Sequence, residues 1–467
     1  MSKRDDQSRS PRTAGKAPSR RSILRALGTA SAVLVPTAVL AQASQARWWE
    51  ALPGFGNGGE GSYGSGARRD PSAREKKNEP LDDLRPDSTP YRSDAMLEAL
   101  DAGIGHYQKI AAAGGWPSIP GPRMIRPGDD DERVPLVRRR LRITGELTGP
   151  AAGYQSLTYD SELEAAVRRY QQRNGLRVSD RIDHPTIAAM SVSAQARLNQ
   201  LRLNYTRLRD LVQGRIEDRY VLVNIPAFQL EAVERFEVQQ RHRVIVGREG
   251  RQTPGLKASI RALNFFPYWR VPDSVATLDL IPKLRKEPEY LDKEKIRVLT
   301  GNFNGPVIDH SVIDWTTANA QAIKFRQDPG PQNALGLVRI DMPNSEGVYM
   351  HDTPMKQLFQ QRTRSFSAGC VRVQDVFKLV GWIARGENGW DEQRIEDTLA
   401  GGQAVDLTLG RQIPVYFTYI TAWAEPSTGQ VEFRPDLYGR DGSKEFSGEH
   451  DPDAPPLPSN AIQALAP

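Results

Sequence analysis

The spacing of apolar residues changes near Tyr220, and this change limits the folds open to the chain. Before it, residues such as Leu163, Val167 and Tyr170 recur at helical intervals. After it, the stretches "YVLVNIPAFQLEAV" and "RHRVIVG" alternate β-branched or aromatic residues with polar ones, which is typical of half-buried antiparallel strands. The sequence therefore predicts an α+β protein, with a small N-terminal helical bundle followed by a β-rich domain with peripheral helices.

The helical half has recognisable helix boundaries. In "TYDSELEAAVRRYQQRNGL" a capping box of Ser161 and Glu164 predicts the helix start, and Asn174-Gly175 predicts its end. Asp183 is the expected cap of the next helix, with a proline in its first turn. We expect three helices to form a bundle over about 134–198.

Residues 1–90 are not predicted to form a folded domain. Residues 19–25 read "SRRSILR", and a short apolar run leads to "AQA" at 41–43, which predicts a twin-arginine export signal cleaved near Ala43. The alternative is a retained membrane anchor, but the run is short and interrupted by polar residues and proline. Residues 44–90 are rich in Gly, Ser, Pro and charge and predict a disordered linker.

We divide the remainder by the changes in pattern. The expected parts are a helical N-terminal part of the scaffold at 91–133, the bundle at 134–198, a connecting helix at 199–218, a β-rich catalytic domain at 219–425, and a C-terminal extension with a disordered tail at 426–467. Within the β-rich domain we expect further strands at 258–266, 336–342, 346–350 and 403–409, and helices near 278–286, 315–324 and 374–385.

The charge balance gives no support to nucleic-acid or membrane binding. The whole chain has 63 Lys plus Arg against 57 Asp plus Glu, a net charge of +6. Residues 1–43 hold eight of the bases and two of the acids, so a chain cleaved at Ala43 has 55 of each. No stable membrane span is expected after such cleavage.

Cys370, in "FSAGCVRV", is the only cysteine of the chain and cannot form an internal disulfide. It could be a small buried hydrophobic residue or a reactive thiol. Gly369 before it would allow close backbone approach, and Ser367 and Arg372 are polar neighbours. We expect this segment to turn into a helix near Gln374, where a helix N-terminus would favour the thiolate.

A nucleophilic thiol needs a base, and His351 is the one histidine within twenty residues of Cys370. It lies in "GVYMHDTP", which predicts a strand end followed by a turn. The two segments could bring imidazole and thiol within hydrogen-bonding reach. The histidines show no metal-ligand spacing, so we expect neither a metal site nor another cofactor.

"YMHDTP" and "FSAGCVRV", with nineteen residues from histidine to cysteine, resemble the active-site signature of the YkuD-type L,D-transpeptidases, in particular the YcbB-like branch. The resemblance continues through "VIVGREGRQTPG", "NFFPYWRVPDSV" and "FRQDPGPQNALGLVRIDMPN". Upstream, "VPLVRRRLRITGEL" and "AAVRRYQQRNGLRVSDRIDHPTIAAM" resemble a peptidoglycan-binding module. An ordinary helical spacer is the alternative there.

The resemblance implies roles for particular residues. Cys370 would be the nucleophile, His351 its general base, and Gly369 and Cys370 would offer backbone N–H groups to the oxyanion. Ser367 and Arg372 would hold the loop, and Tyr349 and Trp269 would line the cleft. A structural role is equally open for Arg372 and Tyr349, and Trp269 could belong to the core.

Two further features follow from the same comparison. Many family members have a histidine where this chain has Ala368, a departure that the branch tolerates and that shifts oxyanion stabilisation toward the backbone. The segment at about 273–335 would form a helical lid over the cleft, or else a helical addition without a part in binding.

The implied reaction is thioester formation on a peptidoglycan tetrapeptide stem, release of D-alanine and cross-linking of diaminopimelate to diaminopimelate in the periplasm. Carbapenem-type inhibitors would acylate Cys370. Water as acceptor would make the protein an L,D-carboxypeptidase, and a protein acceptor would attach an outer-membrane protein to peptidoglycan. A non-catalytic wall-binding protein is the alternative of another class. An unrelated cysteine peptidase fits less well, because such enzymes usually place cysteine before histidine.

Overall fold

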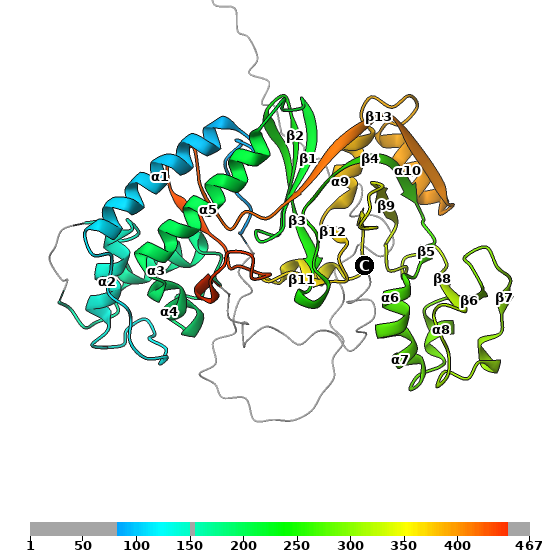
Figure 1. Ribbon diagram of the computed structural model, residues 1–467, viewed down its shortest axis with the longest axis horizontal. Coiled ribbons are helices and arrows are strands. Elements are labelled where there is room, and N and C mark those ends of the chain that lie inside the picture. Colours follow the sequence, from blue (N-terminus) through cyan, green and yellow to red (C-terminus); the bar gives the residue numbers. More distant parts are fainter. Residues whose placement is uncertain (1–81, 150–154, 447–467) are drawn as a thin grey trace, which may run out of the picture. The chain divides into compact units, whose positions relative to one another are not determined.

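The computed structural model describes residues 82–149 and 155–446 (Figure 1). The expected signal at 1–43, most of the linker and the terminal tail lie outside these ranges. The fold is α+β, a helical region followed by a β-rich one. The longer helices are α1 Asp94–Ala112, α2 Val134–Ile143, α3 Ser161–Arg173, α4 His184–Ser191, α5 Ala194–Val212, α9 Val376–Ala384 and α10 Glu392–Gly401. The strands of the main sheet are β1 Arg219–Asn224, β2 Gln229–Glu234, β3 Glu237–Gly247, β4 Leu256–Phe265, β9 Val338–Asp341, β10 Met350–His351, β11 Ser365–Ser367, β12 Val371–Val373 and β13 Val405–Thr418.

Helices α2, α3 and α4 pack around one hydrophobic core. Its fully buried members include Val137, Leu141, Leu163 and Tyr170. Ile119 and Ile125 belong to the same core, so the bundle begins upstream of residue 134. An isolated bridge between Ile125 and Ile182 ties the two ends of the region together.

The helix caps are only partly as expected. Asp183 caps α4, since its side chain accepts a hydrogen bond from the N–H of Thr186. The expected capping box at Ser161 is wrong by one residue. Asp160 is the N-cap of α3 and accepts from the N–H of Leu163 at 2.9 Å. An aspartate caps a helix as well as a serine does, so the two positions compete in the sequence.

The main sheet has the strand order β11-β3-β12-β10-β9-β4-β13-β1-β2. The long strand β3 pairs through its first part with β2 and through its last part with β12 and β11. The pairing of β3 with β2 closes the strands from β3 to β2 into a ring, and β11 adds to it beside β3. The arrangement places β12 and β10 side by side and parallel, with β3 on one flank and β9 on the other.

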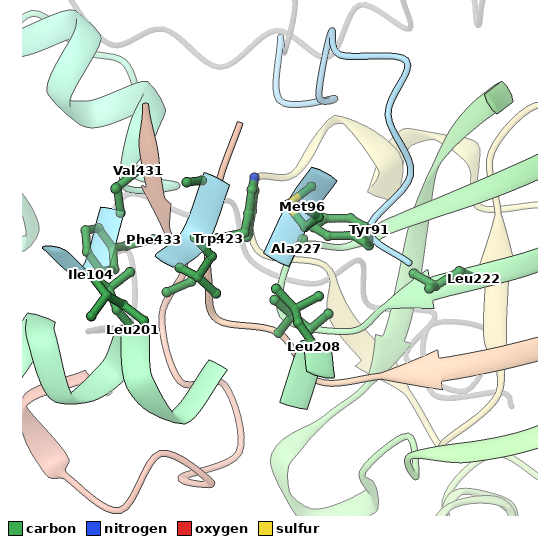
Figure 2. Close-up of a cluster of buried hydrophobic side chains, with 14 of the residues drawn as sticks. Tyr91, Met96, Ile104, Leu201, Leu208, Leu222, Ala227, Trp423, Val431 and Phe433 are labelled. Atoms are coloured by element: carbon green, nitrogen blue, oxygen red, sulfur yellow. The ribbon is translucent and has the colours of Figure 1, made fainter. Parts of the chain in front are cut away.

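The helices α1 and α5 pack on each other and share a core with the main sheet. Figure 2 shows Ile104 of α1, Leu201 and Leu208 of α5 and Leu222 of β1 within this cluster. Trp423 of β14 (Ala422–Ala424) and Phe433 of β15 (Val431–Phe433) lie in it as well. The first part of the C-terminal extension is therefore ordered core structure.

The end of the expected linker is also ordered, which corrects its boundary at residue 90. Arg85 is buried and pairs with Glu231 of β2 at 2.8 Å and with Glu425 at 2.8 Å. Asp83 pairs with Arg243 of β3 at 2.6 Å and with Arg364 at 2.7 Å. Composition alone does not reveal these contacts, because each linker charge is satisfied by a partner at least 140 residues away.

Residues 269–327 form a second, smaller layer with its own core. Strands β5 Trp269–Arg270, β6 Ile296–Thr300, β7 Val307–Ile308 and β8 Ile323–Gln327 make a four-stranded sheet in the order β5-β8-β6-β7. A continuous helical stretch precedes β6, comprising α6 Asp273–Val275, a π-helix Ala276–Leu280 and α7 Ile281–Leu284. We call residues 269–335 the insert. It is mixed in structure, so the expectation of a helical insert is right only in part.

Two expected elements of this part of the chain are wrong. No helix covers 315–324, because Asp314 accepts from the N–H and hydroxyl of Thr316 and fixes a turn instead. The strand expected at 346–350 is reduced to Met350–His351, after a turn in which Asn344 accepts from Glu346. In the described ranges, no helix has the length and apolar content that a membrane crossing requires.

Candidate active site

The strands β10 and β12 bring the two predicted reactive residues together. They pair in parallel, with Met350 opposite Val371 and His351 opposite Arg372. The Val371 N–H donates to the Tyr349 carbonyl at 3.0 Å, which continues the register to Cys370. Because side chains alternate along strands and neighbours in register share a face, Tyr349, His351, Cys370 and Arg372 point to the same face. Cys370 and His351 are diagonal neighbours there.

His351 is fully buried, and its orientation fixes the position of its proton. Nδ1 lies 2.5 Å from the backbone carbonyl of Asp352. A carbonyl can only accept, so Nδ1 carries a hydrogen, and in the neutral imidazole the lone pair is then on Nε2. The neighbouring carboxylate holds the strand end, since Asp352 accepts from the Leu337 N–H at 3.0 Å and pairs with Lys356. The imidazole is thus held in the tautomer that a general base requires.

Cys370 is buried, and burial raises the pKa of its thiol to about 12. Tyr349, Arg372 and Arg339 oppose this by favouring the thiolate, without overcoming the burial. The expected helix N-terminus is not beside the thiol, because strand β12 separates Cys370 from α9. The expectation that a helix start beside the thiol would favour the thiolate is therefore wrong, and burial favours the protonated thiol instead.

The loop before β12 is closed by Ser367. Its hydroxyl donates to the Cys370 carbonyl at 2.6 Å and accepts from the Gly369 N–H at 3.2 Å. Gly369 has φ of +125°, a conformation that favours glycine. The Gly369 N–H is thus engaged within the loop, whereas the Cys370 N–H has no acceptor in the described ranges.

Thr253 and Tyr438, which the sequence analysis did not identify, support this loop through hydrogen bonds. The buried Thr253 hydroxyl donates to the Gly369 carbonyl at 2.8 Å and accepts from the Gly247 N–H at 2.8 Å. The hydroxyl of Tyr438 donates to the Gly247 carbonyl at 2.5 Å and accepts from the Thr253 N–H at 3.2 Å. A Cβ at Gly247 would lie 2.1 Å from the Arg251 carbonyl, so only glycine fits there.

Thr253 and Gly247 both stand in the short stretch "VIVGREGRQTPG". Their nearness in the sequence is the signal that could have identified this contact. Tyr438 gives no such signal, because it lies in the C-terminal extension far along the chain.

The remaining predicted residues lie where the main sheet meets the insert. Trp269 is a buried member of the insert core, and Tyr349 and Ala368 pack against that core. The Tyr349 ring lies 5.8 Å from the His351 ring and 5.3 Å from the Arg339 guanidinium. Burial raises the pKa of Tyr349 well above its usual value, and the negative charge that Cys370 would carry raises it further. Arg372 is fully buried, and its pKa is lowered to about 10 by burial, so it remains charged at neutral pH.

Within residues 82–149 and 155–446, no group of three or more His, Cys, Asp or Glu is placed to hold a metal ion.

Two family models match this chain. Residues 218–395 match the YkuD model, described as an L,D-transpeptidase catalytic domain, and residues 130–190 match a model described as "Putative peptidoglycan binding domain". A Haemophilus influenzae protein named "Putative L,D-transpeptidase" is 33% identical over 246 residues, covering 52% of this chain and 48% of that protein. The chain thus matches about half the length of this curated relative.

Solved structures give weaker similarities. An L,D-transpeptidase from Stackebrandtia nassauensis aligns with 64% of this chain and 96% of its own, at 13% identity and a TM-score of 0.24. One from Xylanimonas cellulosilytica covers 64% and 98%, at 14% identity and a TM-score of 0.20. We draw no conclusion from similarities at this level. By the two family models, the chain carries a YkuD-type L,D-transpeptidase catalytic domain that follows a peptidoglycan-binding domain.

Proposed function

We propose that this protein is an L,D-transpeptidase of the YcbB-like branch that cross-links peptidoglycan stems through diaminopimelate. The observation that carries the proposal is the pairing of β10 with β12, which sets His351 beside Cys370 with its Nδ1 proton committed to the Asp352 carbonyl. Residues 218–395, which contain both strands, match the catalytic domain of this enzyme class.

In the first half-reaction, the Cys370 sulfur attacks the carbonyl carbon at the L-centre of diaminopimelate in a tetrapeptide stem. His351 Nε2 takes the thiol proton during attack, which the raised pKa of the thiol makes necessary. The tetrahedral oxyanion accepts from the Cys370 N–H, and the engaged Gly369 N–H contributes only if the Ser367 contact is released. Collapse breaks the peptide bond, and D-alanine leaves with the proton from His351.

The second half-reaction reverses these steps with a new amine. The side-chain amine of diaminopimelate in a neighbouring stem attacks the thioester carbon while His351 removes its proton. The C–S bond then breaks, the sulfur regains the proton, and a new amide joins the third residues of two stems. The insert lies over Tyr349 and Ala368, and we assign to it the exclusion of water from the thioester.

Product analysis tests this proposal. Purified disaccharide-tetrapeptides incubated with the full chain should give dimers joined through diaminopimelate and released D-alanine, resolved by liquid chromatography. Cys370→Ala should give neither product, and Ser367→Ala should remain active at a reduced rate.

Other outcomes would favour the alternatives. Tripeptide monomers as almost the sole product would identify an L,D-carboxypeptidase. Attachment of an outer-membrane protein, with no stem dimers, would identify a protein acceptor. The absence of all products together with sacculus binding would identify a wall-binding protein without catalysis.

We also propose export to the periplasm by the twin-arginine-type signal in "SRRSILR". N-terminal sequencing of the exported protein should find a start near Ser44. A start at Met1 would contradict cleavage.

A further inference from the structure

A pocket lies between the peptidoglycan-binding domain and the C-terminal extension, away from the residues of the candidate active site. Its walls come from the end of α3, from α4, from the start of α5, from the segment before β11 and from residues after β15. Four arginines line it: Arg177, Arg197, Arg362 and Arg434. We call it the arginine pocket.

Arg362 is the most exceptional of the four. Its guanidinium makes no hydrogen bond or ion pair within residues 82–149 and 155–446, although the side chain is half-buried. Asp83 is close enough to favour its charge, but both Asp83 oxygens already pair with Arg243 and Arg364. Burial, together with the charges of Arg434, Arg364 and Arg177, lowers the pKa of Arg362 to about 10, although the charge of Asp83 opposes the shift.

Arg197 is also without a carboxylate partner in the described chain. It is 6% exposed, donates to the Gln200 side chain at 2.9 Å and stacks on Phe433, while its Nε is buried with no acceptor. A buried cation without an anion is costly. One buried and one half-buried cation, both without a carboxylate bound to them in the described ranges, indicate that an anion from outside completes the pocket.

The acids of the pocket do not meet this need. Asp183 is occupied as the cap of α4, where it accepts from the N–H and hydroxyl of Thr186. Glu445 is exposed. Arg434 is held against Phe433 and Arg173 carbonyls and packs over Gly175, where a Cβ would lie 2.7 Å from its Cδ.

We propose that the arginine pocket binds a carboxylate of a peptidoglycan peptide stem, and this rests on the proposed function. The planar guanidinium fork matches a carboxylate in two parallel hydrogen bonds. Ala188, Val192 and Phe433 give the pocket apolar walls that suit the short alkyl groups beside a stem carboxylate. Most of one wall belongs to residues 130–190, the region matched by the peptidoglycan-binding model. The pocket would hold a stem of the strand on which the enzyme works.

Binding to full-length protein carrying Cys370→Ala, which prevents turnover, tests this assignment. The probe is a purified disaccharide-tetrapeptide, compared with the same compound after amidation of its carboxylates. Adding Arg362→Ala should weaken binding of the free-carboxylate probe about tenfold, the size expected for a charged hydrogen bond. Binding of the amidated probe should not change. Arg362→Lys should recover part of the loss.

The matched control is Arg202→Ala, which removes the same charge from an exposed position on α5 and should leave binding unchanged. Thermal unfolding should be unaltered by Arg362→Ala, because in the part of the chain that the structure describes this guanidinium has no hydrogen-bond or ion-pair partner to lose. If Arg362→Ala binds within twofold of its parent, or the amidated probe shows the same loss, the assignment is wrong. Cross-linking is measured separately, with the protein in which Cys370 is intact. If the proposed function fails, this protein forms no dimers, while Arg362→Ala still weakens binding of the free-carboxylate probe.

Discussion

The main sheet and the insert are held together in different ways. The main sheet shares one hydrophobic core with α1, α5, β14 and β15, and buried ion pairs from Asp83 and Arg85 tie the chain's N-terminal described residues to it. The insert has a separate core built from its own residues, including Trp269, Leu280 and Phe325. The difference indicates that the insert can loosen without unfolding the sheet.

The residues of the candidate active site are divided between the main sheet and the insert. Cys370 and His351 lie on the main sheet, and the insert supplies Trp269 and the surface on which Tyr349 and Ala368 pack. A polar contact joins the regions near the site, where Asp279 of the insert pairs with Arg251 at 2.5 Å. If the proposed function holds, a reactive pair on the main sheet beside a separately folded insert would suit a thioester that must wait for an amine.

The largest effect should come from the main sheet. His351→Ala removes the group that accepts the proton of a thiol whose pKa is about 12, so thioester formation should slow about 10²–10⁴-fold. Stopped-flow acylation with a carbapenem measures this step. His106→Ala, at an exposed position on α1, is the control and should leave the rate unchanged. Retention of half the rate by His351→Ala would remove His351 from the reaction.

Arg85→Ala tests how strongly the end of the linker is bound to the sheet. It leaves Glu425 with a buried charge and no ion-pair partner in the described ranges, whereas Glu231 keeps its pair with Arg241 at 2.9 Å, and the free energy of unfolding should fall by about 3–5 kcal/mol. Urea denaturation followed by tryptophan fluorescence measures it. A change below 1 kcal/mol would mean that residues 82–90 are not part of the folded domain in solution.

Matched cavities in the two cores test their independence. Leu280→Ala in the insert and Leu201→Ala in the shared core should each cost about 2–5 kcal/mol, since both side chains are fully buried. Hydrogen exchange should show faster exchange confined to the insert for Leu280→Ala and across α1, α5 and the sheet for Leu201→Ala. Equal spreading from both sites would contradict two separate cores.

Thr253→Val tests the support beneath the reactive loop. The substitution keeps the shape but leaves the Gly369 carbonyl and Gly247 N–H unpaired, so the acylation rate should fall about tenfold. Because Thr253 acts through the loop, Thr253→Ser should restore the rate while Thr253→Val should not. The insert control is Thr316→Val, which removes a hydroxyl bonded to Asp314 and should leave the rate unchanged. Equal acylation rates for Thr253→Val and Thr316→Val would exclude a positioning role for Thr253.

The pH dependence of alkylation tests the protonation state of Cys370 without any substitution. A thiol with a pKa of about 12 is protonated at neutral pH, and its thiolate fraction rises about tenfold per pH unit below that value. Iodoacetamide alkylation of the resting enzyme should therefore increase steadily from pH 7 to 9. A plateau already reached at pH 6 would show a pre-formed thiolate and contradict the raised pKa.

Much of this arrangement follows from local sequence. The helical and strand periods predict the α+β division, and the family resemblance of "YMHDTP" and "FSAGCVRV" predicts the pair of His351 and Cys370. Long-range polar contacts do not show in local patterns: Arg85 with Glu231 and Glu425, and Tyr438 with Gly247, join segments far apart in the chain. The protonated state of Cys370 is equally hidden, because it depends on burial by distant segments.

The thioester on Cys370 tests the account most directly. Full-length protein mixed with disaccharide-tetrapeptide, quenched in acid and analysed by intact mass and peptide mapping, should carry the stem without its terminal D-alanine on the peptide containing Cys370. Cys370→Ala should carry no adduct under the same conditions. An adduct on any other residue, or D-alanine release that continues in Cys370→Ala, would contradict a mechanism that depends on this thiol.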